Sequence, residues 1–337
     1  MSLIVAAPDK FRQTASAPAV AASVAAAARA AGWTSDEIPL SDGGEGLLDA
    51  FGGSVRTAVV SGPLGQPTEA EWRFLAPPLV EIPTAVIEMA TAAGRDLLAA
   101  PHGAEPLDAT TTGVGQLVLA AIDAGAARVI VGCGGSATTD GGAGALEAIG
   151  SADRFDVVDL VIATDVTTPF EDAAVVFGPQ KGATPDQVEL LEDRLRALRA
   201  SYASRFGVDV GVLRGAGAAG GLAGGLAALG GRIVSGFDLV AGFVRLDARL
   251  EPADVVMTGE GRLDPQSFRG KVVGQVIDRV AGRIPVLCVV GDVDPAARSL
   301  AGPGVEIVSL TEQFGEGRAR AETAGVIGEV VAEFLRR

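Results

Sequence analysis

Residues 128–144 have the sequence RVIVGCGGSATTDGGAG, in which a short apolar run leads into a long stretch of small residues. The run Arg128–Gly132 predicts a buried strand, because it is rich in β-branched residues and too short for a helix. The glycines after it let backbone amides approach an anion closely, and the hydroxyl side chains add donors. Since every glycine costs backbone entropy on folding, so many together indicate a binding loop. The loop is no Walker A motif, because it lacks the Gly-Lys-Ser/Thr ending.

The chain repeats this alternation of apolar runs and helix-period segments along its length, as βα units do. We expect strands at residues 3–7, 37–40, 55–60, 69–75, 85–89, 159–163, 174–177, 254–258, 285–290 and 305–310. We expect helices at residues 17–31, 112–124, 185–206, 272–280 and 319–336. Its 337 residues exceed what one hydrophobic core usually serves, and both ends show the same rhythm. The sequence therefore predicts an α/β fold of two domains, an outer one of residues 1–60 plus 245–337 and an inserted Gly-rich one of residues 61–244.

The charge and composition exclude several classes of partner. A formal charge of −15 argues against nucleic acid, which binds a basic surface. An anionic substrate must then be met by backbone amides, a metal ion or a few cations.

Cys133 and Cys288 lie far apart in apolar runs and are expected to be buried thiols. The Ala-rich stretch 20–31 is too short to span a bilayer, and residues 1–8 lack the features of a signal peptide, so we expect a cytoplasmic protein.

Charged side chains follow several predicted strands, at the end where open α/β sheets bind ligands. Asp42 and Glu45 lie on one glycine loop and can hold Mg²⁺ or orient a hydroxyl, although turn chemistry also explains an Asp-Gly-Gly sequence. Lys181 lies between glycines and can reach a phosphate, with an ordinary loop as the alternative. Asp165 ends another predicted strand, a position that suits a catalytic carboxylate. Residues 258–271 gather two acids and three cations, which suits a charged substrate and a metal ion together.

Two other features lead to no activity. Residues 215–220 contain a formal G-x-G-x-x-G, but no convincing strand precedes them. We therefore reject a dinucleotide site and expect close helix packing or a loop against a ligand. An NAD-dependent oxidoreductase is the third alternative, which rests only on this segment and would need detectable nicotinamide binding. His102 is the lone histidine and lies in a Pro/Gly loop, so a catalytic triad is unsupported and a surface position is expected.

Taken together, these segments make the chain resemble the type I glycerate kinases nearly end to end. The matching segments are residues 7–11 (APDKF), 42–46 (DGGEG), 87–90 (IEMA), 109–113 (ATTTG), 134–138 (GGSAT), 140–142 (DGG), 177–184, 258–264 and 269–271. The resemblance implies transfer of the ATP γ-phosphoryl group to a hydroxyl of D-glycerate with Mg²⁺. It also implies two α/β domains, an inserted one and a Rossmann-like outer one, with the active site in the cleft between them.

Phosphoryl transfer needs positioning and charge neutralisation more than covalent chemistry, and the roles are assigned on that basis. The residues assigned to catalysis are Asp165, Asp264, Lys10 and Arg12. Those assigned to substrate and phosphate binding are Asp9, Gly134, Gly135, Ser136, Thr138, Lys181, Arg269 and Lys271. Those assigned to the metal are Asp42, Glu45 and Glu260.

One departure and several alternatives accompany this interpretation. The family usually has Phe-Lys-Gly-Ser where this chain has residues 11–14, FRQT, and the planar guanidinium of Arg12 makes a different contact from an ammonium group. The alternatives are a kinase for another small hydroxy acid or polyol, and a non-catalytic anion or nucleotide sensor, which would gain nothing from the carboxylates. The resemblance favours 2-phosphoglycerate over 3-phosphoglycerate. The oligomeric state stays open, a homo-oligomer included.

Overall fold

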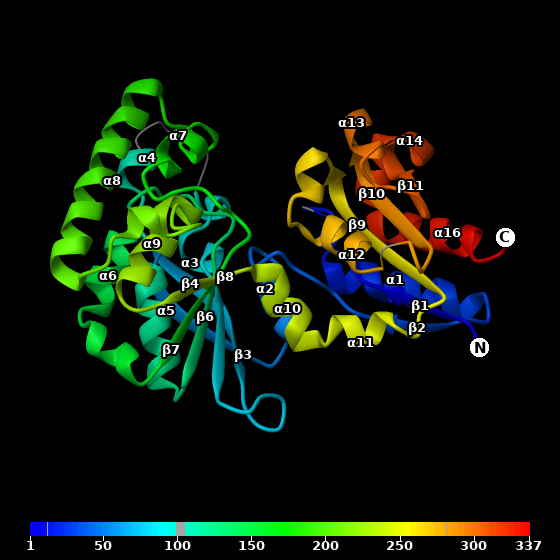
Figure 1. Ribbon diagram of the computed structural model, residues 1–337, viewed down its shortest axis with the longest axis horizontal. Coiled ribbons are helices and arrows are strands. Elements are labelled where there is room, and N and C mark those ends of the chain that lie inside the picture. Colours follow the sequence, from blue (N-terminus) through cyan, green and yellow to red (C-terminus); the bar gives the residue numbers. More distant parts are fainter. Residues whose placement is uncertain (12, 99–104, 281) are drawn as a thin grey trace. The chain divides into compact units, whose positions relative to one another are not determined.

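The computed structural model describes residues 1–11, 13–98, 105–280 and 282–337 (Figure 1). These residues form two compact units, unit 1 of residues 1–42 and 237–337, and unit 2 of residues 43–236. Each unit is built on a sheet of parallel or mainly parallel strands, which confirms the predicted α/β fold with one unit inserted in the other.

Unit 1 contains a five-stranded parallel sheet in the order β11-β10-β9-β1-β2. Its strands are β1 (Leu3–Ala6), β2 (Thr34–Glu37), β9 (Val255–Leu263), β10 (Val286–Val293) and β11 (Val305–Ser309). The expected strand at 37–40 lies three residues earlier, because the polar sequence TSDE forms the edge strand β2. Residues 38 and 40 continue beside β1, since their N–H groups donate to Ala6 O (2.7 Å) and Pro8 O (2.9 Å).

Helices cover both faces of this sheet, and two separate apolar clusters show it. Alternate residues of β9 and β10, such as Met257 and Leu287, pack with α1 (Ala17–Ala30) and α16 (Thr323–Phe334). The opposite face packs with the apolar side of α12 (Val272–Val280). The shorter helices of this part of the chain are α10 (Gly236–Val244), α11 (Leu246–Leu250), α13 (Pro295–Arg298), α14 (Leu310–Phe314) and α15 (Glu316–Ala321).

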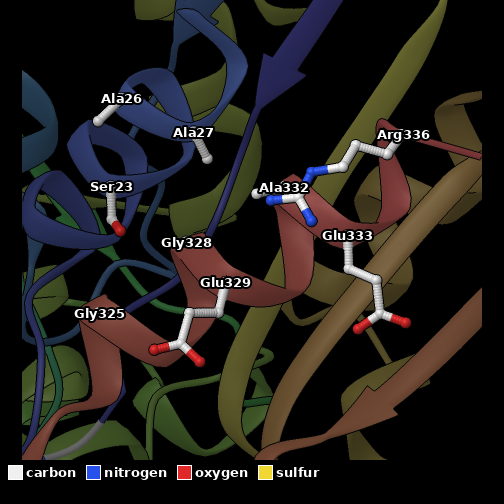
Figure 2. Close-up of a pocket in the computed structure, with 9 residues that line it drawn as sticks. All are labelled: Ser23, Ala26, Ala27, Gly325, Gly328, Glu329, Ala332, Glu333 and Arg336. Atoms are coloured by element: carbon white, nitrogen blue, oxygen red, sulfur yellow. The ribbon is translucent and has the colours of Figure 1, made fainter. Parts of the chain in front are cut away.

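Small residues let α1 and α16 pack closely. Ser23 Oγ of α1 donates to Ala324 O of α16 at 2.5 Å, and a Cβ added at Gly328 would lie 2.8 Å from Ser23 Oγ. A shallow groove of about 670 Å³ runs along this helix pair (Figure 2). Alanine and glycine line most of it, and Glu329, Glu333 and Arg336 stand along α16 and its end. None of the residues predicted to act on a substrate lies there.

Unit 2 contains a six-stranded sheet in the order β3-β4-β5-β6-β7-β8. Its strands are β3 (Ser54–Ser61), β4 (Pro67–Leu75), β5 (Thr84–Glu88), β6 (Arg128–Gly132), β7 (Asp159–Ala163) and β8 (Arg232–Val234). The first two strands form an antiparallel hairpin, and β5 to β8 are parallel. The expected outer domain ended at residue 60, whereas β3 pairs along its whole length with β4 and so belongs to unit 2.

The helices of unit 2 surround the parallel strands. They are α2 (Leu47–Phe51), α3 (Ala90–Ala93), α4 (Glu105–Asp108), α5 (Thr112–Asp123), α6 (Ala143–Ile149), α7 (Ala173–Phe177), α8 (Pro185–Phe206) and α9 (Leu222–Ala228). The prediction of a strand at residues 174–177 is wrong, because these residues form part of the short helix α7. Helix α8 has the predicted bounds, since a Thr184–Gln187 capping box begins it and left-handed Gly207 ends it. Within the described ranges, no helix combines the length and the apolar character needed to cross a membrane.

Candidate functional site

In unit 1, the strand order places a ligand site beside β1. The chain leaves β1 for β2 on one side and returns to β9 on the other, and open α/β sheets bind ligands at the carboxyl ends of strands where the order reverses in this way. Asp9 follows β1, and its N–H donates to Gly259 O of β9 at 2.9 Å. A Cβ added at Gly259 would lie 1.9 Å from Val289 O and 3.3 Å from the Phe11 ring, so only glycine fits beneath this turn.

Three carboxylates lie near one another at this edge, and we call Asp9, Asp42 and Glu260 the acidic cluster. Burial, together with the charges of Asp42 and Glu260, raises the pKa of Asp9 to about 7, although Lys10 opposes the shift. Burial likewise raises the pKa of Glu260 to about 7, with contributions from Asp264 and Asp42. Glu260 Oε1 is buried and has no hydrogen-bond partner among the described residues. Burial and the neighbouring carboxylates thus favour the protonated forms of Asp9 and Glu260.

The loop after β9 supplies cations and a structural carboxylate. Lys271 is close enough to Glu260 that its charge lowers the pKa of that carboxyl group. Asp264 Oδ1 accepts hydrogen bonds from the N–H groups of Gln266 (2.7 Å) and Ser267 (3.2 Å). Asp264 thus caps a short 3₁₀ helix, Pro265–Phe268, and fixes the course of the loop that leads to Arg269.

In unit 2, residues 133–142 form the loop between β6 and α6, and we call it the glycine loop. It packs against residues 43–48, which we call the 43–48 turn. A Cβ added at Gly134 would lie 2.6 Å from Gly44 Cα, and one at Gly135 would lie 2.5 Å from Glu45 Oε1. The glycines therefore serve a close approach between two backbone segments, in addition to leaving amides accessible.

Two cations and two hydroxyl groups lie beside the glycine loop. Lys181 Nζ donates to Thr138 O at 2.5 Å. The backbone N–H of Arg95 donates to Gly135 O at 3.0 Å, and its guanidinium group donates to Gln180 O at 3.4 Å. Burial and the nearby charge of Arg95 lower the pKa of Lys181 to about 7, against the opposing effect of Asp140. The hydroxyl groups of Thr138 and Thr139 are buried and have no partner among the residues that the structure describes. Two neighbouring cations and two unpaired donors suit an anionic ligand.

Asp140 explains another part of the glycine loop. Its carboxylate accepts from Thr111 N and Oγ1, both at 2.8 Å, and from the N–H groups of Gly142 (3.0 Å) and Gly144 (3.1 Å). Asp140 therefore ties the beginning of α6 to the beginning of α5. Residues 110–113 (TTTG) and 140–142 (DGG) therefore have a structural role in the site.

Asp165 follows β7 and lies beside Gly236, the last residue of unit 2. Its Oδ1 accepts the N–H of Gly236 at 3.1 Å. Gly43, with φ +89°, begins unit 2 beside it, and a Cβ added there would lie 2.7 Å from Gly236 Cα and 3.1 Å from the carbonyl carbon of Ala163. The first and last residues of unit 2 are thus in contact, and Asp165 fixes one of them.

The G-x-G-x-x-G segment serves packing, as expected. A Cβ added at Gly217 would lie 2.2 Å from Pro169 O, and one at Gly220 would lie 2.0 Å from Thr138 O. The segment thus packs against the glycine loop at Thr138. It follows no strand among the described elements.

The predicted site residues divide between the two units. Unit 1 contains Asp9, Lys10, Asp42, Glu260, Asp264, Arg269 and Lys271. Unit 2 contains Glu45, Gly134, Gly135, Ser136, Thr138, Asp165 and Lys181. Arg12 and His102 lie outside the described residues. Of the predicted metal ligands, Asp42 and Glu260 share a unit and Glu45 belongs to the other, and the described ranges contain no group of three or more His, Cys, Asp or Glu placed to hold a metal ion.

Sequence reasoning missed two residues of unit 2. Arg95 follows β5 and α3, so the rule that polar residues after strands face the site would have found it. Glu88 ends β5 within a matched segment, but its hydrogen bonds to the 43–48 turn depend on tertiary structure.

Comparison with known proteins identifies the family. The family model described as "Glycerate kinase family" matches residues 4–153 and 151–336. The chain belongs to the glycerate kinase family. It is 36% identical to the glycerate 2-kinase of Escherichia coli (strain K12) over 80% of this chain and 79% of that one. It is 34% identical to a glycerate kinase of Bacillus subtilis (strain 168), over 90% and 88% of the two chains.

A solved structure of the same family supports the fold. The crystal structure of a putative glycerate kinase 2 from Salmonella typhimurium LT2 matches with a TM-score of 0.78 and 31% identity. The match covers 99% of this chain and 98% of that one, so the glycerate kinase fold extends over the whole chain.

Proposed function

We propose that this chain transfers the γ-phosphoryl group of ATP to a hydroxyl of D-glycerate, with 2-phosphoglycerate as the favoured product. The observation that carries the proposal is the acidic cluster at the switch point of the unit 1 sheet, with the unpaired Oε1 of Glu260. Anion binding alone gains nothing from three carboxylates, whereas phosphoryl transfer needs a metal ion and an acceptor for the hydroxyl proton. Membership of the glycerate kinase family supports the same reaction.

The acidic cluster fits Mg²⁺. A buried carboxylate oxygen without a partner and two carboxyl groups with raised pKa values are features of a site that binds a cation. Asp42 and Glu260 would hold the ion, because Mg²⁺ usually takes one or two carboxylates and completes its shell with water and phosphate oxygens. When bound, it supplies neutralisation of the phosphate charge.

Asp9 is the proton acceptor in this proposal. A general base works best when its pKa lies near the working pH, and the pKa of Asp9 is raised to about 7. Asp165 and Asp264, both assigned to catalysis from the sequence, already accept backbone hydrogen bonds. We therefore assign them to positioning of the Gly236 segment and of the loop that carries Arg269 and Lys271.

The unit 2 residues bind phosphate in this proposal. Lys181 and Arg95 supply positive charge, and Thr138 and Thr139 supply hydroxyl donors without other partners. Ser136 and the amides around Gly134 and Gly135 complete the anion site. On an acidic chain, these local groups are what a nucleotide phosphate would meet. A cytoplasmic location remains a prediction that accompanies this function.

A coupled ADP-release assay with D-glycerate, ATP and Mg²⁺ tests the proposal. We expect ADP release that depends on glycerate, and NMR of the product should show phosphorus coupling to the C2 proton for 2-phosphoglycerate. Coupling to the C3 protons instead would change the product to 3-phosphoglycerate. Folded protein that shows no glycerate-dependent turnover would contradict the proposal and favour a kinase of another hydroxy acid or a sensor.

A further inference from the structure

Glu88 is a buried carboxylate at the carboxyl end of β5, beside Gly132 of β6 in the strand register. Its Oε1 accepts hydrogen bonds from the N–H of Gly46 at 2.8 Å and from the N–H of Leu48 at 3.0 Å. These are among the first N–H groups of helix α2, which have no partner within a helix. Glu88 thus joins the beginning of α2 to the edge of the sheet.

The local sequence of α2 explains why this cap comes from another strand. The N-cap residue is Gly46, with φ +94°, a left-handed conformation that a residue with a side chain adopts only with strain. Glycine has no side chain to accept a hydrogen bond from the helix, and no such bond is present. A carboxylate is the strongest substitute, because it accepts charge-assisted hydrogen bonds and faces the positive end of the peptide dipoles.

The same turn is held on its other side by the glycine loop. Gly44 lies against Gly134, and the carboxylate of Glu45 lies against Gly135. Gly135 O in turn accepts the N–H of Arg95. The 43–48 turn is therefore fixed between Glu88 and the glycine loop. The position of the Glu45 carboxylate depends on both contacts.

We propose that Glu88 is a positioning residue for phosphoryl transfer: by capping α2 it sets the carboxylate of Glu45 against Gly135 and so fixes the glycine loop of the proposed phosphate site. This inference rests on the proposed function. Glu88 touches no substrate in this scheme and acts through Glu45. Its contribution to turnover should therefore disappear when Glu45 no longer carries a charge.

A double-mutant cycle tests this dependence. Glu88→Leu removes the acceptor, and we expect kcat to fall at least about tenfold, as it does when an interaction needed in the transition state is lost. Glu45→Gln should lower kcat by a similar factor. The double variant should be little worse than either single variant, because coupled residues are not additive. Multiplicative losses in the double variant would overturn the proposal.

Two further variants separate positioning from general stability. Glu88→Gln keeps an oxygen that can accept both hydrogen bonds, so it should restore most of the kcat lost in Glu88→Leu. Glu88→Asp keeps the charge but shortens the side chain by one methylene group, so kcat should fall as in Glu88→Leu. It also provides a readout if Glu88→Leu does not fold. Equal loss in Glu88→Gln and Glu88→Leu would contradict capping.

A matched control lies at the opposite edge of the same sheet. Asp159→Asn weakens the ion pairs of Asp159 with Arg128 and Arg232, and it should lower the Tm without lowering kcat. Hydrogen exchange at Gly46 and Leu48 should become faster in Glu88→Leu and stay slow in Asp159→Asn. Wild-type protein without glycerate-dependent turnover would overturn the proposed function and the positioning role together. A kcat unchanged by Glu88→Leu in active protein would overturn the role alone.

Discussion

In unit 1 the strands end at three carboxylates, whereas in unit 2 the residues beside the glycine loop include two cations and two unpaired hydroxyl groups. Both edges bury charged groups, and burial shifts the pKa of Asp9 upward and that of Lys181 downward, in each case to about 7. Burial disfavours the charged form of each of these groups. The edge in unit 1 is therefore suited to bind a cation or a proton, and the edge in unit 2 is suited to bind an anion. The difference teaches that burial of charged side chains at the ends of strands can prepare two sheets of one acidic chain for ligands of opposite charge.

The largest effect should come from the acidic edge. Asp9→Asn removes the proposed proton acceptor, and kcat should fall by about 10²–10⁴, the usual contribution of a general base. The KM for ATP should change little, because the proposed phosphate site lies in unit 2. Steady-state kinetics check this, with Asp36→Asn as the control, since Asp36 pairs with Arg249 elsewhere in the same unit. Near-normal kcat in Asp9→Asn would exclude Asp9 as the base.

A smaller effect should come from the cationic edge. Lys181→Met should weaken ATP binding about 10- to 100-fold, the range for loss of a hydrogen bond to a charged group. Calorimetry in the presence of Mg²⁺ measures the Kd, and Arg196→Met, which removes an exposed cation of α8, is the control. Weaker glycerate binding with unchanged ATP binding would instead assign this edge to the substrate carboxylate.

The response of stability to pH should distinguish the two edges. Asp9 and Glu260 have folded pKa values of about 7, above their unfolded values, so the stability they contribute is present in acid and is lost as pH rises through about 7. Mg²⁺ should offset this loss, so that the rise in Tm on adding MgCl₂ is greater at pH 8 than at pH 5.5. Glu260→Gln should reduce this difference. A rise in Tm that is independent of pH would place Mg²⁺ outside the acidic cluster.

The smallest effect concerns the point where the chain enters unit 2. Gly43→Ala combines a left-handed φ with a clash against the backbone of Gly236, whereas Gly125→Ala has nearly the same φ (+92°) and open space around it. Strain alone should cost about 1–2 kcal/mol in both variants, and the clash should destabilise Gly43→Ala further. Chemical denaturation measures both. Equal losses would show that the contact with Gly236 relaxes freely.

The sequence predicted the fold class and several elements, and the misses have physical causes. Helix α8 was predicted to the residue, because its cap and its terminal glycine are local signals. Strand β2 was misplaced, since an edge strand needs no apolar residues, and the alanine- and valine-rich residues 174–177 fit a strand and a helix equally. Short apolar runs do not distinguish these two structures.

The candidate site was predicted only in part, because local signals can be read from the sequence and tertiary contacts cannot. The loops that carry Asp9, Asp42 and Glu260 were recognisable as ends of strands, but their meeting depends on the order of strands in the sheet. The structural roles of Asp140 and Glu88 could not be predicted, because each accepts hydrogen bonds from N–H groups of segments distant in sequence. A carboxylate in a matched segment is thus as open to a structural role as to a chemical one.

The position of β1 between β2 and β9 in the unit 1 sheet has a consequence for biosynthesis. Its neighbour β9 is translated only after all of residues 43–236, which takes of the order of ten seconds or more at usual elongation rates. Throughout that interval the apolar strand Leu3–Ala6 has β2 beside it but lacks β9, and α1 lacks α16. A segment synthesised before unit 2 is therefore fully buried only after unit 2 has been synthesised, and chaperones that bind apolar segments have most to protect there.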